Sequence, residues 1–290
     1  MTVGPFGERL ERAMAARGPL CVGIDPHAAL LRAWGFDDDV AGLERWTRTA
    51  VEALAGTVAA VKPQSAFFER FGSRGVAVLE TVIAETKAAG ALVIGDVKRS
   101  DIGSTMDAYA QAYLDPTSPL GCDAMTVSPY LGVGALRSTF DYARKHGNGV
   151  FVLVLTSNPE GREVQDARVG SGTLAQHVID QIGAYNIECA TEPDSLGSIG
   201  AVIGATIGRT DHAFSRLHGP FLAPGLGAQG ATAADLPVVF GPQLRAVLPT
   251  VSRTVLQAGP NAVALQQAAV REIAACASAR DQVASSIARH

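Results

Sequence analysis

The chain has 290 residues, of which 47% are hydrophobic and 18% are charged, and its formal net charge is -4. This composition supplies a sizeable apolar core and argues against intrinsic disorder. It shows no basic stripe of the kind that binds nucleic acid, although a single phosphate or carboxylate ligand would need only a local patch of charge.

Short apolar runs alternate with longer amphipathic stretches along the chain. Most of the runs are continuous, as expected for parallel strands that are buried on both faces, although one is short and the last contains Pro249. The predicted strands are 20–25, 58–62, 92–97, 124–127, 150–155, 199–204, 221–224 and 246–251. The predicted helices are 42–55, 75–89, 106–114, 134–145, 173–189 and 262–289, with short helices at 210–217 and 232–236 and loops at 37–39 and 160–170.

Repeated strand–helix alternation predicts a parallel sheet with crossover helices, and eight repeats favour closure into a barrel. Such a barrel typically takes ~250 residues. No linker or change in composition divides the chain. We therefore expect residues 1–290 to form a single (β/α)8 TIM-barrel catalytic domain of the α/β class.

Charged residues lie where the first three predicted strands end. Asp25 ends the first strand and Lys62 the second, while Asp96, Lys98 and Asp101 end the third. The chain has only four lysines, and two of them occupy these positions. Because active sites of this fold lie at the carboxyl ends of the strands, we expect these side chains to meet at one mouth of the barrel.

Asp96 and Lys98 are two residues apart, so a strand would point both side chains to the same face. Flanking carboxylates favour a charged lysine, and the lysine favours anionic aspartates. One interpretation is a structural ion-pair network, since such networks also perturb pKa values. The other is a functional array, which would explain why several ionisable groups are desolvated together.

The segment FLAPGLGAQGA contains Gly225, Gly227 and Gly230 in the spacing of a dinucleotide fingerprint. That interpretation is disfavoured, because the motif comes late in the chain and no acidic residue closes a second strand ~20 residues later. A phosphate site built by loops after strands seven and eight fits better. Gln229 can donate from its amide, and Arg253 can bind a phosphate with two hydrogen bonds, although it could also be an ordinary surface arginine.

The fifth predicted strand ends in Thr156, Ser157 and Asn158. Hydroxyl groups and exposed backbone at this place could bind the edge of a polar heterocycle. An ordinary turn capped by Ser, Asn and Pro would use the same residue types.

Four cysteines are scattered along the chain without a CxxC motif or a Cys/His cluster. This pattern predicts neither a disulfide framework nor a zinc site, and it indicates a reducing compartment. No run approaches the ~18 apolar residues of a membrane span, and the first residues lack the apolar segment of a secretory signal. We expect a cytoplasmic protein with no membrane partner.

The segment DVKRSDIGST resembles the D-x-K-x-x-D-I-x-x-T signature of the orotidine 5′-phosphate decarboxylase family. The motifs VGIDP, VKPQ, TVSPYLG, TSNPEG and APGLGAQG occur in the order that this family shows, and the matches extend from Asp25 to Arg253. The length and the loop at 37–39 are similar to the longer bacterial-type branch.

The resemblance implies a cofactor-free barrel enzyme that converts orotidine monophosphate to UMP and CO2 in pyrimidine biosynthesis. It implies that Lys98 donates a proton to C6 and that Asp96 faces the substrate carboxylate. The enzyme would be a homodimer in which Asp101, Ile102 and Thr105 act across the interface. The remaining implied contacts are Asp25 and Lys62 with the ribose hydroxyls and the charged array, Ser157 with the pyrimidine, and Gln229 and Arg253 with the phosphate.

Loss of CO2 from C6 leaves a carbanion with no obvious electron sink, and most decarboxylases recruit a cofactor for such a step. The sequence shows no motif that demands one, so electrostatic stabilisation would have to lower the barrier. We expect binding energy at the phosphate to close mobile segments, namely 160–170 and the stretch after Gly227.

Three alternatives stay open. Related barrel lyases that act on sugar-phosphate keto acids use Mg²⁺, usually with an extra acidic ligand at the end of the second strand, where this chain has Lys62. A Schiff-base aldolase would use Lys62 or Lys98 as a nucleophilic amine. A non-catalytic nucleotide-binding protein would keep the pocket without turnover. His27 and His212 receive no functional role.

Overall fold

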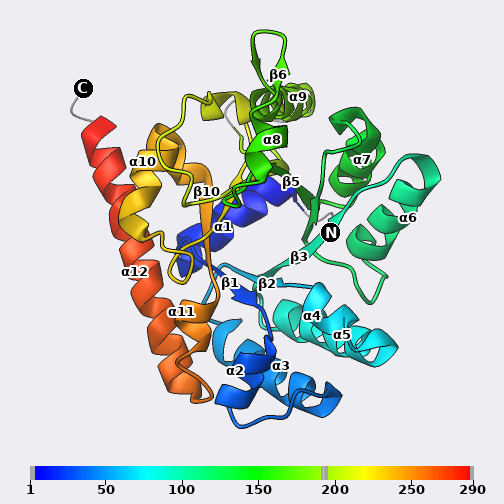
Figure 1. Cartoon of the computed structure of the whole chain (residues 1–290), viewed down its shortest axis with the longest axis vertical. Coiled ribbons are helices and arrows are strands. Elements are labelled where there is room, and N and C mark those ends of the chain that lie inside the picture. The colour runs from blue at the N-terminus through cyan, green and yellow to red at the C-terminus, as the bar shows by residue number, and fades with distance from the viewer. Residues whose placement is uncertain (1–3, 191, 193–194, 288–290) are drawn as a thin grey trace.

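The computed structural model describes residues 4–190, 192 and 195–287. Eight parallel strands form a closed barrel in the order β1-β10-β9-β8-β5-β4-β3-β2 (Figure 1). The predicted (β/α)8 barrel is therefore confirmed. The strands are β1 (Cys21–Ile24), β2 (Ala60–Pro63), β3 (Leu92–Arg99), β4 (Ala124–Val127), β5 (Gly149–Leu155), β8 (Ile199–Ile203), β9 (Phe221–Pro224) and β10 (Val247–Val251).

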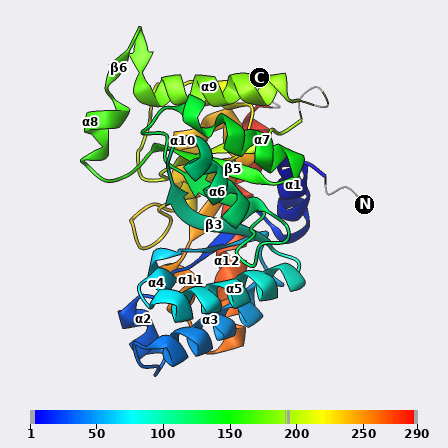
Figure 2. The ribbon, with the colours of Figure 1, turned by 90° about the vertical axis from the view of Figure 1, so that its right-hand side faces the viewer.

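Helices surround the barrel, and Figure 2 shows several of them layered along its outer side. The long ones match the predicted segments, except that the last predicted residues lie outside the described part of the chain. They are α3 (Val40–Leu54), α5 (Gly72–Ala88), α6 (Gly103–Leu114), α7 (Arg137–Lys145), α9 (Leu174–Glu188) and α12 (Ala262–Ile287). The short ones are α2 (Ala28–Ala33), α4 (Ala66–Glu69), η1 (Val133–Leu136), η2 (Phe214–Leu217), η3 (Ala233–Asp235), α10 (Leu236–Phe240), η4 (Gly241–Ala246) and α11 (Arg253–Leu256).

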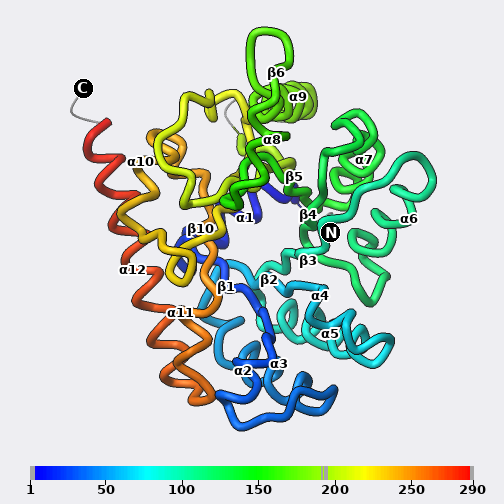
Figure 3. The backbone as a smooth tube through the Cα atoms, viewed as in Figure 1, coloured from blue at the N-terminus to red at the C-terminus, as the bar shows by residue number. Residues whose placement is uncertain are grey.

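The last helix, α12, closes the ring of helices against the first ones. It packs against α3, and the backbone trace in Figure 3 shows it running along the outer edge of the barrel. Asp39 begins α3 as its N-cap, because its side chain accepts a hydrogen bond from the Gly42 amide at 2.7 Å. The predicted loop at 37–39 thus leads directly into the helix.

An additional helix, α1 (Phe6–Arg17), packs against the amino-terminal ends of the strands. Phe6 meets Phe151 edge-to-face at 5.8 Å, and a Cβ atom on Gly149 would lie only 2.2 Å from the Phe6 ring. Arg9 adds an ion pair with Asp123, just before β4. Because α1 and the inward-facing strand residues share one apolar cluster, this end of the barrel is packed, and a ligand site must lie at the other end.

The prediction of a loop at 160–170 was wrong for most of its length. This segment forms α8 (Gly161–Gln165) and then the antiparallel pair β6 (Arg168–Val169) and β7 (Gly172–Thr173), which projects from the barrel in Figure 2. Gln165 holds α8 through side-chain hydrogen bonds with Thr156, at 3.0 Å to its amide and 2.7 Å to its hydroxyl. Elements of two to five residues are too short to show a hydrophobic period in the sequence.

Within the described residues, no helix combines the length and the apolar character that crossing a bilayer requires.

Candidate active site

A cavity of about 410 Å³ opens at the carboxyl ends of the barrel strands. Seven of the ten site residues predicted from the sequence line it, and they come from six different strands or the loops that follow them. They are Asp25, Lys62, Asp96, Lys98, Ser157, Gln229 and Arg253. Of the five charged strand-end residues that we expected to meet at one mouth, Asp25, Lys62, Asp96 and Lys98 lie together in this cavity, whereas Asp101 does not line it.

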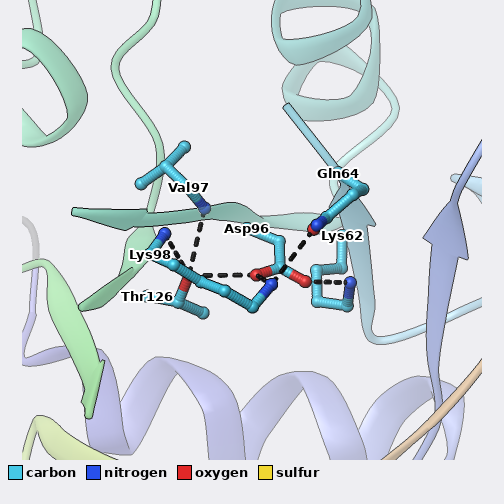
Figure 4. Close-up of polar contacts among 6 residues, drawn as sticks. All are labelled: Lys62, Gln64, Asp96, Val97, Lys98 and Thr126. Carbon is cyan, nitrogen blue, oxygen red and sulfur yellow. Dashed lines mark hydrogen bonds and ion pairs between the residues drawn. The ribbon is translucent and has the colours of Figure 1, made fainter. Parts of the chain in front are cut away.

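Asp96 is the centre of the charged cluster (Figure 4). Its Oδ2 lies 2.6 Å from Lys62 Nζ, and its Oδ1 lies 2.5 Å from Lys98 Nζ. The Lys62 side chain is only 8% exposed, whereas that of Lys98 is 44% exposed. Lys62 is thus a buried counter-ion of Asp96, and Lys98 presents its ammonium group to the cavity.

The electrostatics of the cluster keep both buried groups charged. Burial by itself would raise the pKa of Asp96, but the ammonium groups of Lys62 and Lys98 lower it to about 2. Burial would likewise lower the pKa of Lys62, but Asp96 and then Asp25 outweigh it and raise that pKa above its usual value. A charged lysine is a poor nucleophile, so this environment does not favour a Schiff base on Lys62.

Two residues of the cluster were missed by the sequence analysis. The amide of Gln64 bridges the pair: in the orientation that satisfies both of its polar atoms, its nitrogen donates to Asp96 Oδ2 at 2.6 Å and its oxygen accepts from Lys98 Nζ at 3.3 Å. Thr126 donates its hydroxyl to Asp96 Oδ1 at 3.0 Å. Both had a signal in the sequence: Gln64 is two residues after Lys62, and Thr126 is a polar residue within an apolar strand.

The strand β3 is irregular where it carries the cluster. Its register with β4 shifts between Gly95 and Arg99, so that Asp96, Val97 and Lys98 stand opposite the single residue Thr126. Lys98 has φ +45, a left-handed conformation that costs a non-glycine residue on the order of 1–3 kcal/mol. Bulges of this kind redirect side chains next to active sites, and this one turns Lys98 back toward Asp96.

The opposite side of the cavity contains the glycine segment after β9. Gly225, Gly227 and Gly230 all have positive φ, and a Cβ atom on Gly227 would lie 1.8 Å from the Thr254 hydroxyl. The segment leads into η3 (Ala233–Asp235) and not into a long helix, so it lacks the context of a dinucleotide fingerprint. Gln229 and Arg253 are both exposed at this side.

Ser157 lies between the two sides of the cavity. Its hydroxyl is 3.5 Å from Gln229 Oε1, so the residue predicted to contact a heterocycle adjoins one predicted to bind a phosphate. Asp25 lines the cavity near Lys62, and its Oδ1 atom is buried without a hydrogen-bond partner. A ligand hydroxyl could satisfy this oxygen.

Three predicted site residues lie outside the cavity lining. Asp101 accepts a hydrogen bond from the Ile102 amide at 2.8 Å, Ile102 is 62% exposed, and Thr105 is exposed on α6. Of the two histidines that received no role, His27 lines the cavity and contacts the Phe67 ring at 4.2 Å between centroids. His212 instead contacts the hydroxyls of Thr173 and Thr210 beside the cavity.

Among the residues that the structure describes, no group of three or more His, Cys, Asp or Glu side chains is arranged to hold a metal ion. The end of β2 carries the Lys62 ammonium group, which is paired with Asp96.

The fold and this mouth together define a (β/α)8-barrel enzyme with a charged pocket at the carboxyl ends of its strands. The family model "Orotidine 5'-phosphate decarboxylase / HUMPS family" matches residues 18–268, and the chain belongs to this family.

Relatives named orotidine 5′-phosphate decarboxylase match most of the chain. One from Salinispora tropica is 64% identical over 275 residues, covering 94% of this chain and 98% of the relative. One from Streptomyces coelicolor is 61% identical over 268 residues, covering 92% and 95%. A crystal structure from Streptomyces avermitilis, titled with the same activity, is 58% identical, has a TM-score of 0.91 and covers 97% of this chain and 98% of its own.

Proposed function

We propose that this chain decarboxylates orotidine 5′-phosphate to UMP and CO2 and that Lys98 protonates C6 of the pyrimidine. The observation that carries the proposal is the half-exposed Lys98 ammonium group, fixed on Asp96 and open to a cavity large enough for a nucleotide. Curated relatives that match nearly the full chain are named for the same activity.

The reaction follows from charge placement at the mouth. Breaking the bond from C6 to the carboxyl carbon leaves an electron pair on C6, and CO2 departs. The Lys98 ammonium group stabilises this charge as it forms and then transfers a proton to C6. Asp96, held anionic by Lys62, repels the substrate carboxylate more than the transition state, in which the charge has moved to carbon.

The rest of the cavity supplies binding groups at matching places. Asp25, whose Oδ1 atom is without a partner, would accept a hydrogen bond from a ribose hydroxyl, and the Lys62 ammonium group would donate to a ribose hydroxyl. Ser157 would contact the pyrimidine edge, and Gln229 and Arg253 would bind the phosphate beside the glycine segment. A phosphate bound there is remote from C6, so its binding energy can be used to order the loops around the reacting carbon.

The active form in this proposal is a cytoplasmic homodimer of one-domain subunits. Asp101, Ile102 and Thr105 would each complete the mouth of the partner subunit, which fits their position outside their own cavity lining. Large apolar side chains after β3 and β4 are exposed and could be covered by such a partner; they are Ile102, Tyr130 and Leu131.

The test adds orotidine monophosphate to the purified, EDTA-treated protein and follows the loss of ultraviolet absorbance. We expect turnover that EDTA does not change, and complete loss of turnover in Lys98→Ala with the fold intact by circular dichroism. Lys145→Ala, which removes an exposed lysine on α7, is the matched control.

Activity lost on chelation would favour a metal-dependent lyase, and tight UMP binding without turnover would favour a non-catalytic binding protein. Near-normal turnover in Lys98→Ala would exclude Lys98 as the proton donor.

A further inference from the structure

We propose that Thr126 is a positioning residue whose hydroxyl holds the β3 bulge and thereby aims Lys98 and Asp96 at the reacting carbon. This inference rests on the proposed decarboxylation and adds a residue to it. Its basis is the meeting of three hydrogen bonds on one buried oxygen atom (Figure 4).

The Thr126 hydroxyl oxygen uses its full hydrogen-bonding capacity. A threonine hydroxyl has one O–H donor and two acceptor lone pairs. Thr126 Oγ1 donates to Asp96 Oδ1 at 3.0 Å, and it accepts from the backbone N–H groups of Val97 at 3.0 Å and Lys98 at 2.9 Å. The one donor and both acceptor sites of this hydroxyl are therefore used by three consecutive residues of β3, Asp96, Val97 and Lys98. Thr126 itself is 1% exposed, so water does not compete for these bonds.

The register of β3 and β4 shifts beside Thr126. Gly95 pairs with Met125 and Arg99 pairs with Val127, which leaves Asp96, Val97 and Lys98 opposite Thr126 alone. The Thr126 side chain thus serves as the acceptor for two backbone amides within the bulge. Without this hydroxyl, the buried N–H group of Val97 and the partly buried N–H group of Lys98 lose that acceptor, and unpaired buried donors are costly.

The backbone of Lys98 has a left-handed conformation. Its φ of +45 is rare for a residue with a side chain and persists only where the surroundings fix it. The hydrogen bond from the Lys98 amide to Thr126 is part of that restraint. The ammonium group of Lys98 is held by Asp96, and the same hydroxyl also holds Asp96, so one side chain fixes both ends of Lys98.

A valine has nearly the shape of threonine but cannot form any of these bonds. We expect Thr126→Val to lower kcat by about 100-fold, the scale at which small misplacements of reacting groups act, while KM changes less than about threefold. KM should be spared because the phosphate contacts lie on the other side of the cavity. Thr126→Ser keeps the hydroxyl and should retain kcat within about fivefold of the unmodified protein.

A control separates positioning from general destabilisation. Thr47→Val also removes a buried, hydrogen-bonded threonine hydroxyl, which donates to the Leu43 carbonyl oxygen at 2.8 Å on α3, and it should leave kcat unchanged because Thr47 lies outside the cavity lining. If Thr126→Val does not fold, Thr126→Ala is assayed below its melting temperature with the same expectation. Hydrogen exchange of the peptide that contains Val97 and Lys98 gives a readout independent of turnover, and we expect faster exchange in Thr126→Val but not in Thr126→Ser.

The outcomes are distinguishable. Unmodified protein without turnover contradicts the proposed function, and the exchange experiment still tests the bulge. Active unmodified protein with an unchanged kcat in Thr126→Val overturns the positioning role. A loss of kcat that serine does not restore would show that the methyl group or the volume matters, and it would also overturn the inference.

Discussion

Lys62 and Asp96 form an ion pair with an N–O distance of 2.6 Å, and their side chains are only 8% and 11% exposed. Each charge is stable in the barrel because the other is present, since an isolated buried ion of either kind would be strongly disfavoured. The pair also determines the geometry of the second lysine. Lys62 contacts Oδ2 of Asp96, and Lys98 contacts the remaining carboxylate oxygen, Oδ1.

The first prediction concerns the stability that depends on this pair. Lys62→Met removes the charge, keeps most of the length and leaves Asp96 with Lys98 as its remaining cation. We expect the free energy of unfolding in urea to fall by about 3–5 kcal/mol, the usual cost of removing one partner of a buried ion pair. Lys145→Met is the surface control. Adding Asp96→Leu to Lys62→Met should recover part of the loss, and a single variant as stable as the unmodified protein would contradict a buried pair.

The second prediction concerns acid. The pKa of Asp96 is lowered from 3.8 to about 2 in the folded protein, chiefly by the two lysines acting against burial. A carboxyl group with a lowered folded pKa stabilises the fold above its unfolded pKa, and this contribution is lost as the pH falls from about 4 toward 2. The contribution is about 2 kcal/mol by linkage.

Urea unfolding of the unmodified protein and of Asp96→Asn at several pH values between 5 and 2 measures this contribution. We expect the stability difference between the two proteins to shrink as the pH falls. The pKa of Asp115 is also lowered to about 2, by hydrogen bonds from Thr117 and Tyr142, but that group is present in both proteins and cancels. A difference that stays constant over this range would mean that Asp96 is not held anionic by its neighbours.

The sequence was sufficient to predict the barrel because each strand is a compact apolar run. The predicted strands 124–127 and 221–224 coincide with β4 and β9, and the others differ at their ends by only a few residues. The site was predictable for a related reason. Active sites of this fold lie at the carboxyl ends of the strands, so the charged residues Asp25, Lys62 and Asp96 at the ends of apolar runs were candidates for the mouth.

The features that the sequence did not reveal depend on contacts between distant segments. The bulge in β3 exists only through its register with β4, about 30 residues later, and nothing in DVK indicates that Lys98 takes a positive φ. Helix α1 was not among the predicted helices, and its place became clear from the packing of Phe6 on Gly149. Helix α8 is held by side-chain hydrogen bonds between Gln165 and Thr156 that no local period predicts.

The third prediction concerns the phosphate. Arg253→Ala removes an exposed guanidinium group at the start of α11, on the side of the cavity next to the glycine segment. We expect kcat/KM for orotidine monophosphate to fall by about 10- to 100-fold, because hydrogen bonds to charged groups contribute about 1.5–3 kcal/mol each. Stability should not change, since the group is exposed.

Arg271→Ala on α12 removes a comparable exposed arginine away from the mouth and is the control. The Arg253 variant should also lose most of its discrimination between UMP and uridine in binding experiments. An unchanged kcat/KM would mean that the phosphate is bound by other residues.

The fourth prediction concerns the shared site. Lys98→Ala and Asp101→Asn should each be inactive as pure proteins, because each removes a different charged group from every mouth of a homodimer. When the two are mixed after mild denaturation and refolding, half of the dimers are mixed. Each mixed dimer then has one mouth with both defects and one with neither, so about a quarter of the activity should return.

Activity that does not return, although mixed dimers are detected by mass spectrometry, would place Asp101 in the mouth of its own subunit. Mixing Lys98→Ala with Asp96→Asn is the negative control, because both changes lie on one β3 strand and every mouth of the mixed dimer remains defective.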